Sequence, residues 1–215
     1  MSDVVGGAPS GAPPAHMRGV RLSDHVRSVA IGDQTVLLDL RRDKYLCLST
    51  TALAQTLRQA ESGHHSSLYT ALSRGGLVSH GEGSRREVSK QIRSTLAPMP
   101  ATFVYACVWA QRIVAARRLD KAVGAFSHSS GNVDASAATA RFLHWRPWFP
   151  ARNVCLFDSL ALSRFLLFAG ARFELVFGVR LAPFAAHCWV ESSGRILNDE
   201  SGYCRSFTEI MRVDG

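Results

Sequence analysis

One long apolar stretch, residues 155–170, limits what this chain can fold into. It reads CLFDSLALSRFLLFAG and is interrupted only by four polar or charged residues, Asp158, Ser159, Ser163 and Arg164. Asn153 can cap a helix here, Asp158 suits the first turns, and Gly170 can end the last turn. The pattern predicts a helix that is apolar around nearly its whole circumference, as in the buried central helix of a domain.

Cys155 opens this predicted helix. The unpaired N–H groups and the positive dipole end of a helix N-terminus lower the pKa of a thiol, which raises the fraction of thiolate. The alternative is a small core residue, because free cysteine is among the most buried residue types.

A predicted hairpin follows about thirty residues downstream. Residues 173–180 and 186–191 are typical of strands, and residues 192–194 separate the second strand from residues 195–199. A three-residue loop, with Gly194 in the left-handed conformation, pairs Glu191 with Arg195 and sets His187 opposite Asp199. A two-residue or four-residue loop would set Asp199 opposite Cys188 instead. We predict the three-residue loop and a His187–Asp199 contact.

Thiol, imidazole and carboxylate in this order suit a cysteine nucleophile. His187 would hold the thiolate of Cys155 and later protonate the leaving group, while Asp199 would fix the imidazole tautomer. An acyltransferase would use the same triad with an amine in place of water. A metal site built from Cys155, His187, Cys188 and Cys204 is a further alternative, but no C-x-x-C or H-x-x-x-H spacing supports it.

Four motifs support a family resemblance. They are Cys155-Leu-x-x-Ser-Leu-Ala-Leu, Gly170, Phe177-Gly-Val-Arg and Phe184-x-x-His-x-Trp-Val-Glu. Together they make residues 146–199 similar to the transglutaminase-like cysteine protease domain of lasso peptide biosynthesis B proteins. The resemblance implies that Cys155, His187 and Asp199 are the triad of a leader peptidase. Cys188 stands where that family usually has a small residue such as Ala, and we do not expect it to disturb the triad.

The same resemblance implies partners and cofactors. The substrate would be the leader of a ribosomally made lasso precursor peptide. The second partner would be the lasso cyclase, similar to asparagine synthetase, which uses ATP to close the ring after cleavage. The chain has no Walker loop or dinucleotide fingerprint, so we expect it to bind no cofactor directly.

The N-terminal part predicts a small winged-helix-like domain. Residues 25–31, 35–39 and 44–48 form a predicted three-stranded meander, and helices are predicted from about 50 to 60 and from 66 to 74. A winged helix that binds DNA is one interpretation. The arginines are spread along the chain and not massed on the second helix, which disfavours it.

This arrangement also resembles the precursor-peptide recognition element that some lasso B proteins carry ahead of the protease, a relative of the small peptide chaperone of pyrroloquinoline quinone biosynthesis. Leu77-Val78 after Arg74-Gly-Gly resembles the Arg-Gly-Leu-Leu of that element, although the segment between the helices is shorter. The resemblance implies that a leader adds as a strand to the exposed meander edge. The implied leader-binding residues are Lys44, Tyr45, Leu46, Cys47, Leu48, Leu68 and Tyr69.

We therefore expect an α+β chain with a disordered tail (1–19), a leader-recognition domain (20–80), a linker (81–100) and a transglutaminase-like, papain-like protease domain (101–215), whose central helix packs on an antiparallel sheet. A helix is predicted over residues 102–122, with Val104, Cys107, Val108, Ile113 and Val114 on its apolar side. Asp134 is expected to cap another. The aromatic run 144–148 either lines the substrate cleft or fills the domain.

Composition bears on partners and compartment. A net charge of +8 could suit nucleic acid, an acidic surface or an acidic peptide, and charge alone does not choose among them. Five widely spaced cysteines without a signal peptide favour the reducing cytoplasm. The apolar segment 101–116 is too short to span a membrane. We expect neither a nucleic-acid nor a membrane partner.

Overall fold

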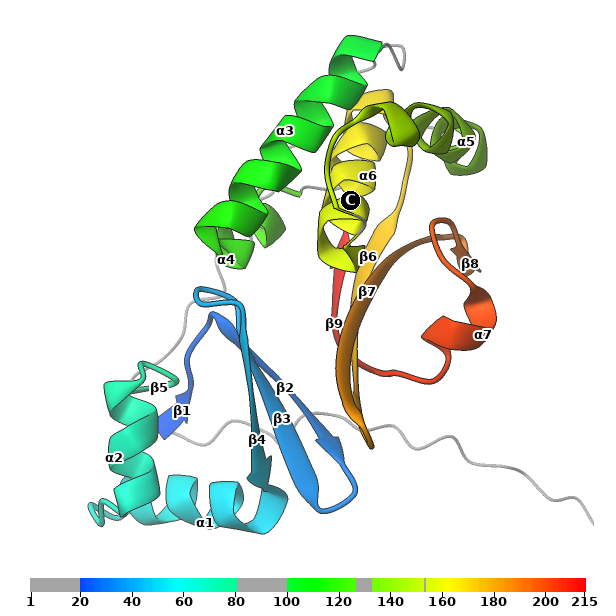
Figure 1. The fold of residues 1–215 in the computed structure, drawn as a ribbon. Coiled ribbons are helices and arrows are strands. Elements are labelled where there is room, and N and C mark those ends of the chain that lie inside the picture. Colours follow the sequence, from blue (N-terminus) through cyan, green and yellow to red (C-terminus); the bar gives the residue numbers. More distant parts are fainter. Residues whose placement is uncertain (1–19, 81–99, 127–132, 153) are drawn as a thin grey trace, which may run out of the picture.

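The computed structural model describes residues 20–80, 100–126, 133–152 and 154–215 (Figure 1). The predicted tail and nearly all of the predicted linker lie outside these ranges. Within them the chain is α+β, as predicted, with an N-terminal module of strands and helices and a C-terminal unit built on a helix and a sheet.

The N-terminal module contains the predicted meander, in which β2 (Val26–Ile31), β3 (Gln34–Asp39) and β4 (Lys44–Ser49) are antiparallel. Ser49 caps α1 (Thr50–Glu61), and Ser66 caps α2 (Ser67–Arg74). An additional pair, β1 (Val20–Leu22) with β5 (Val78–His80), closes the module and was not predicted.

Strand β3 is buried on both faces. Leu37 packs in a cluster with residues of α1 and α2, including Leu53 and Leu72. Val36, Leu38 and Leu40 belong instead to the core of the C-terminal unit. A strand covered on both faces accounts for the nearly continuous apolar run over 36–40. The two parts of the chain therefore share one core.

The C-terminal unit has an antiparallel sheet in the order β8-β7-β6-β9. Its strands are β6 (Glu174–Leu181), β7 (Phe184–Ser192), β8 (Arg195–Ile196) and β9 (Thr208–Asp214). Helix α6 (Cys155–Ala169) covers one face, and the short α7 (Ser201–Cys204) lies on the other side (Figure 1). Strand β9 was not predicted.

Helix α6 confirms the prediction of a buried central helix. Ten of its residues are buried, and Gly170 ends it with a left-handed φ of 74°. Its N-cap is Val154, which makes no side-chain capping bond. The predicted cap, Asn153, lies outside the described residues.

The predicted helix over 102–122 is two helices, α3 (Pro100–Ala116) and α4 (Leu119–Val123). Arg117 adopts a positive φ of 49° between them, which ends the first helix. The placement of Val104 on the apolar side was wrong, because Val104 is 48% exposed. Cys107 is buried as predicted, and Ile113 and Val114 pack against the core. The other buried residues of α3 are Phe103, Ala106 and Ala110.

Helix α5 (Ala135–Trp145) is capped by Asp134 as predicted, and a 3-10 turn over Arg146–Trp148 follows it. Of the two roles considered for the aromatic run, the structure supports filling of the domain, and only for part of the run. Trp145 packs on the core through Phe103 and Phe165, whereas Trp148 is 82% exposed. None of the helices in the described ranges combines the length and the apolar content needed to cross a membrane.

Candidate active site

The β7–β8 hairpin differs from the predicted one. Ser192 pairs with Arg195 and Glu191 with Ile196, so the loop contains only Ser193 and Gly194. Both loop residues have positive φ values, 50° and 75°. Two-residue turns of this kind match the twist of the flanking strands. Ser193 adopts the left-handed conformation, which the prediction assigned to Gly194 alone. The three-residue loop and the Glu191–Arg195 pair were therefore wrong.

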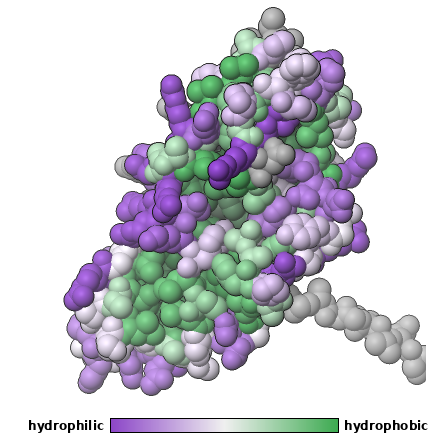
Figure 2. Space-filling model, in the orientation of Figure 1, coloured by the Kyte–Doolittle hydropathy of each residue, from purple (hydrophilic) through white to green (hydrophobic). Residues whose placement is uncertain are grey.

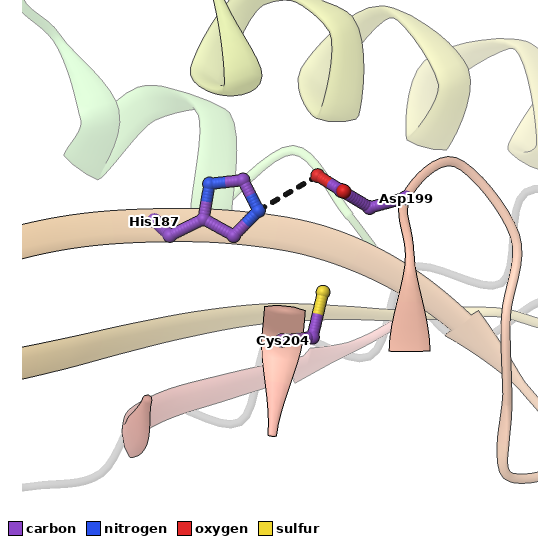
Figure 3. Close-up of side chains that lie close together, drawn as sticks. All are labelled: His187, Asp199 and Cys204. Atoms are coloured by element: carbon purple, nitrogen blue, oxygen red, sulfur yellow. Dashed lines mark hydrogen bonds and ion pairs between the residues drawn. The ribbon is translucent and has the colours of Figure 1, made fainter. Parts of the chain in front are cut away.

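The predicted His187–Asp199 contact is nevertheless present, with 2.8 Å between Nε2 of His187 and Oδ2 of Asp199 (Figure 3). It does not arise from strand register, because β8 ends at Ile196. The side chain of Asn198 accepts the backbone N–H of Val190 at 2.8 Å. The chain leaves the sheet at this point, and Asp199 returns toward His187.

His187 lies on β7 in an aromatic surround. Its ring is 8% exposed and lies within 6 Å of three aromatic rings, those of Trp189, Tyr203 and Phe207. Its second ring nitrogen points away from Cys204 in Figure 3. Asp199 therefore bonds to Nε2 of His187, and Nδ1 is available to the Cys155 thiol.

Gly178 pairs with His187 across the sheet. A Cβ at this position would lie 2.8 Å from Cβ of Phe207 and 2.9 Å from the Trp189 ring. Only glycine lets these two aromatic side chains approach the backbone behind His187, which accounts for the glycine in the Phe177-Gly178-Val179 motif.

Cys155 is the first residue of α6, the helix that packs against β7. The groups that stabilise its charged form are the thiol and the backbone N–H of Cys188 and the ring of His187. The Cys188 thiol is the largest cause that lowers the pKa of Cys155, followed by His187, and burial opposes them. The pKa falls to about 4, so the group is a thiolate at neutral pH.

The pKa of His187 moves in the opposite direction. The hydrogen bond with Cys155 raises it most, burial opposes this effect, and Asp199 adds a further rise. A lowered thiol pKa beside a raised imidazole pKa defines a thiolate–imidazolium pair, which is the reactive form of a cysteine nucleophile.

Cys188 is 3% exposed and stays protonated, because the adjacent Cys155 and complete burial raise its pKa well above the usual value. A protonated thiol can donate a hydrogen bond to the thiolate of Cys155. No sequence pattern indicates this contact, because residues 155 and 188 come together only when α6 packs against β7.

One group of three side chains in the described ranges could approach a metal ion, namely His187, Asp199 and Cys204, with ligand atoms within 4.8 Å of one another (Figure 3). The group does not include Cys155 or Cys188. Burial raises the pKa of Cys204 to about 11, which keeps its thiol protonated, and Nε2 of His187 is already bonded to Asp199. These donors fit a hydrogen-bonded His–Asp pair better than a metal site.

A groove with a volume of about 290 Å³ runs beside β4, whose outer edge pairs with no strand among the described residues. It is lined by Leu37, Asp39, Arg42, Lys44, Tyr45, Leu46, Gly75 and Leu77. Three of the predicted leader-binding residues, Lys44, Tyr45 and Leu46, are in this set. Figure 2 shows apolar side chains gathered over the N-terminal module, in the lower part of the view.

The other predicted leader-binding residues lie outside the groove lining. Cys47 is exposed further along β4 and bonds to Gln34. Leu48 and Leu68 pack against the N-terminal cluster. Tyr69 is 6% exposed, and its hydroxyl bonds to His80, so this side chain belongs to the core. The groove lining also contains Asp39, Arg42, Gly75 and Leu77, which no sequence pattern places beside β4.

One end of the groove lies near Cys155, whose charge raises the pKa of the groove residue Tyr45 after burial and the charges of Cys188 and Asp43. The Tyr45 ring lies 5.9 Å from that of Phe184, at the tip of the β6–β7 hairpin. Burial raises the pKa of the neighbouring Asp43 most, and the charge of Cys155 raises it further. The start of β4 is therefore within electrostatic reach of the Cys155 sulfur.

The C-terminal unit identifies the class of protein. The profile of the transglutaminase-like superfamily matches residues 101–212, and the chain belongs to this superfamily, whose members are typically cysteine peptidases or transferases. In addition, 48 residues are 47% identical to the microcin J25-processing protein McjB of Escherichia coli. This similarity covers 22% of the chain and 23% of that protein. No solved structure matches the chain significantly.

Proposed function

We propose that the protein is a cysteine peptidase that removes the leader from a ribosomally made lasso precursor peptide. The observation that carries this proposal is the His187–Asp199 pair, joined at 2.8 Å, beside a Cys155 thiol whose pKa His187 and Cys188 lower to about 4. The transglutaminase-like superfamily and the similarity to a microcin-processing protein support the same class of reaction.

The geometry supports a two-step mechanism. The Cys155 thiolate attacks the scissile carbonyl carbon, and the His187 imidazolium gives its proton to the departing amine, leaving a thioester. His187 then takes a proton from the water that attacks the thioester, and departure of the Cys155 thiolate releases the acid and restores the thiolate–imidazolium pair. Asp199 holds the imidazole in the tautomer that both steps need. The backbone N–H of Cys155, at a helix start without a side-chain cap, can stabilise the oxyanion.

The groove beside β4 supports leader binding by strand addition. An unpaired strand edge offers N–H and C=O groups to an extended peptide, and Lys44, Tyr45 and Leu46 supply side-chain contacts. Because β4 begins near Cys155, a peptide seated on this edge would place one end close to the nucleophile. The proposed partners are the precursor and an ATP-using cyclase similar to asparagine synthetase. The peptidase itself would need no cofactor and would work in the cytoplasm.

The test is incubation of the full chain with a lasso precursor encoded beside its gene, followed by mass spectrometry. The expected products are leader and core peptide separated by hydrolysis of one bond. The matched control is Cys155→Ala, checked for folding by circular dichroism, and it should release no product. Cleavage by Cys155→Ala near the wild-type rate would refute the proposal. Transfer of the acyl group to an added amine in preference to water would identify a transferase.

A further inference from the structure

A buried hydroxyl links the helix of the nucleophile to the strand of the histidine. Ser159 is fully buried and lies four residues after Cys155, on the same face of α6. Its Oγ donates to the backbone carbonyl of Cys188 at 3.0 Å. Cys188 directly follows His187 on β7, so this bond fixes α6 against the strand edge beside the imidazole.

The same hydroxyl accepts a hydrogen bond from Asn198. The distance from Nδ2 of Asn198 to Oγ of Ser159 is 2.9 Å, and Oδ1 of Asn198 accepts the N–H of Val190 at 2.8 Å. Asn198 directly precedes Asp199. One amide side chain therefore ties the segment that carries the carboxylate both to β7 and to α6.

We infer that Ser159 and Asn198 are positioning residues that hold Cys155, His187 and Asp199 in their relative places. Their two side chains, called here the Ser159–Asn198 clamp, connect the three segments that carry the triad. This inference rests on the proposed role of Cys155 as nucleophile, and it adds a function to two residues outside the triad.

The alternative backbone path shows what the clamp prevents. If β8 continued in the register set by Glu191 and Ile196, Asp199 would stand opposite Cys188 and away from the His187 ring. The Leu197 N–H still bonds to the Val190 carbonyl at 2.8 Å, but the side-chain oxygen of Asn198 takes the N–H of Val190, which continued pairing would give to the Leu197 carbonyl. Without the amide, this buried backbone donor would need another partner, and continued strand pairing would supply one.

The test compares two buried serines of the same helix. Ser159→Ala removes the clamp, whereas Ser163→Ala removes a hydroxyl that is equally buried and has no hydrogen-bond partner among the described residues. We expect Ser159→Ala to lower kcat by about 10- to 100-fold with a smaller change in KM, because misplacement by about 1 Å can cost that much. Ser163→Ala should stay within about twofold of wild type.

A second readout does not depend on the peptide substrate. The rate of iodoacetamide alkylation at Cys155, assigned by mass spectrometry and followed against pH, reports the coupling of the thiolate to His187. Asn198→Ala should shift this profile in the same direction as Asp199→Asn. In the Asp199→Asn background, Asn198→Ala should lower the alkylation rate of Cys155 by less than a further factor of about two, because both changes remove the same alignment of His187.

Equal effects of Ser159→Ala and Ser163→Ala on kcat would overturn the inference. It would also be overturned if the losses of alkylation rate from Asn198→Ala and Asp199→Asn multiplied in the double variant. If Ser159→Ala does not fold, the Asn198→Ala comparison decides alone. If the wild-type chain cleaves no precursor, the proposed function fails, yet the alkylation profiles still test the clamp.

Discussion

At the scale of single residues, the chemistry depends on the contacts that Cys155 makes after folding. A helix start lowers a thiol pKa only modestly, whereas hydrogen bonds from Cys188 and His187 lower it to about 4. The sequence predicted that Cys155 opens a helix, that His187 lies on a strand, and that His187 contacts Asp199. It could not predict Cys188 as a donor, because that contact depends on how α6 docks.

The first prediction concerns pH. The thiolate forms as pH rises through about 4, and the imidazolium is lost as pH rises through the raised pKa of His187, above its usual 6.5. Activity that needs both charges should therefore rise from acid pH, reach a plateau and fall on the alkaline side. The measurement is kcat/KM for the precursor against pH. A profile that rises steadily toward pH 9 would show that the resting thiol is neutral.

The second prediction concerns Cys188→Ala, which the sequence alone suggested would be nearly silent. Loss of the thiol donor should raise the pKa of Cys155, so its alkylation rate should fall near pH 5 and approach wild type at alkaline pH. Cys188→Ser, which keeps a donor, should restore part of the rate. The matched control is Cys107→Ala, a buried cysteine in α3. If Cys188→Ala left the profile unchanged, the thiol contact would have no chemical role.

At the scale of elements, the third prediction concerns the wall behind His187. Gly178→Ala would place a methyl group 2.8 Å from Cβ of Phe207 and 2.9 Å from the Trp189 ring. Overpacking of this kind destabilises by about 1 to 3 kcal/mol, and displacement of Trp189 would also disturb the imidazole. Urea unfolding and kcat measure the two effects. Gly202→Ala, where a Cβ meets nothing within 4 Å, is the control.

A Gly178→Ala protein as stable and as active as wild type would mean that Phe207 and Trp189 can move aside at no cost. The aromatic surround would then have no part in positioning His187.

Most elements could be predicted from local patterns, because their signals lie within a few residues. Helix α6 has its apolar run and Gly170, and the meander has its alternation and turns. The β7–β8 turn shows the limit of such patterns, because Ser193 adopts a conformation that the prediction assigned to Gly194 alone. The His187–Asp199 contact was predicted through the wrong register and forms through the side chain of Asn198. A side chain that takes the place of a backbone hydrogen-bond partner follows no periodic pattern. The sequence alone therefore cannot indicate it.

At the scale of the whole molecule, the two predicted domains share one core. Val36, Leu38 and Leu40 of the N-terminal module pack with α6 and the sheet of the C-terminal unit. A polypeptide ending near residue 83 would expose this apolar face, so leader binding and catalysis are best separated by point substitutions in the full chain. The shared core also fixes the groove relative to Cys155, and under the proposed function a leader bound there would have a high effective concentration at this residue.

The last prediction follows from this arrangement. Leu46 is 39% exposed and lines the groove, so Leu46→Asp should weaken leader binding with little effect on the core. We expect KM for the full precursor to rise by about 10-fold, the loss that one poorly seated apolar contact produces. Cleavage of a short peptide that spans only the scissile bond should not change, because it never occupies the groove. Val104→Asp, at an exposed apolar position on α3, is the matched control. Equal losses on both substrates would place Leu46 in the catalytic site, and no loss on either would place the leader on another surface.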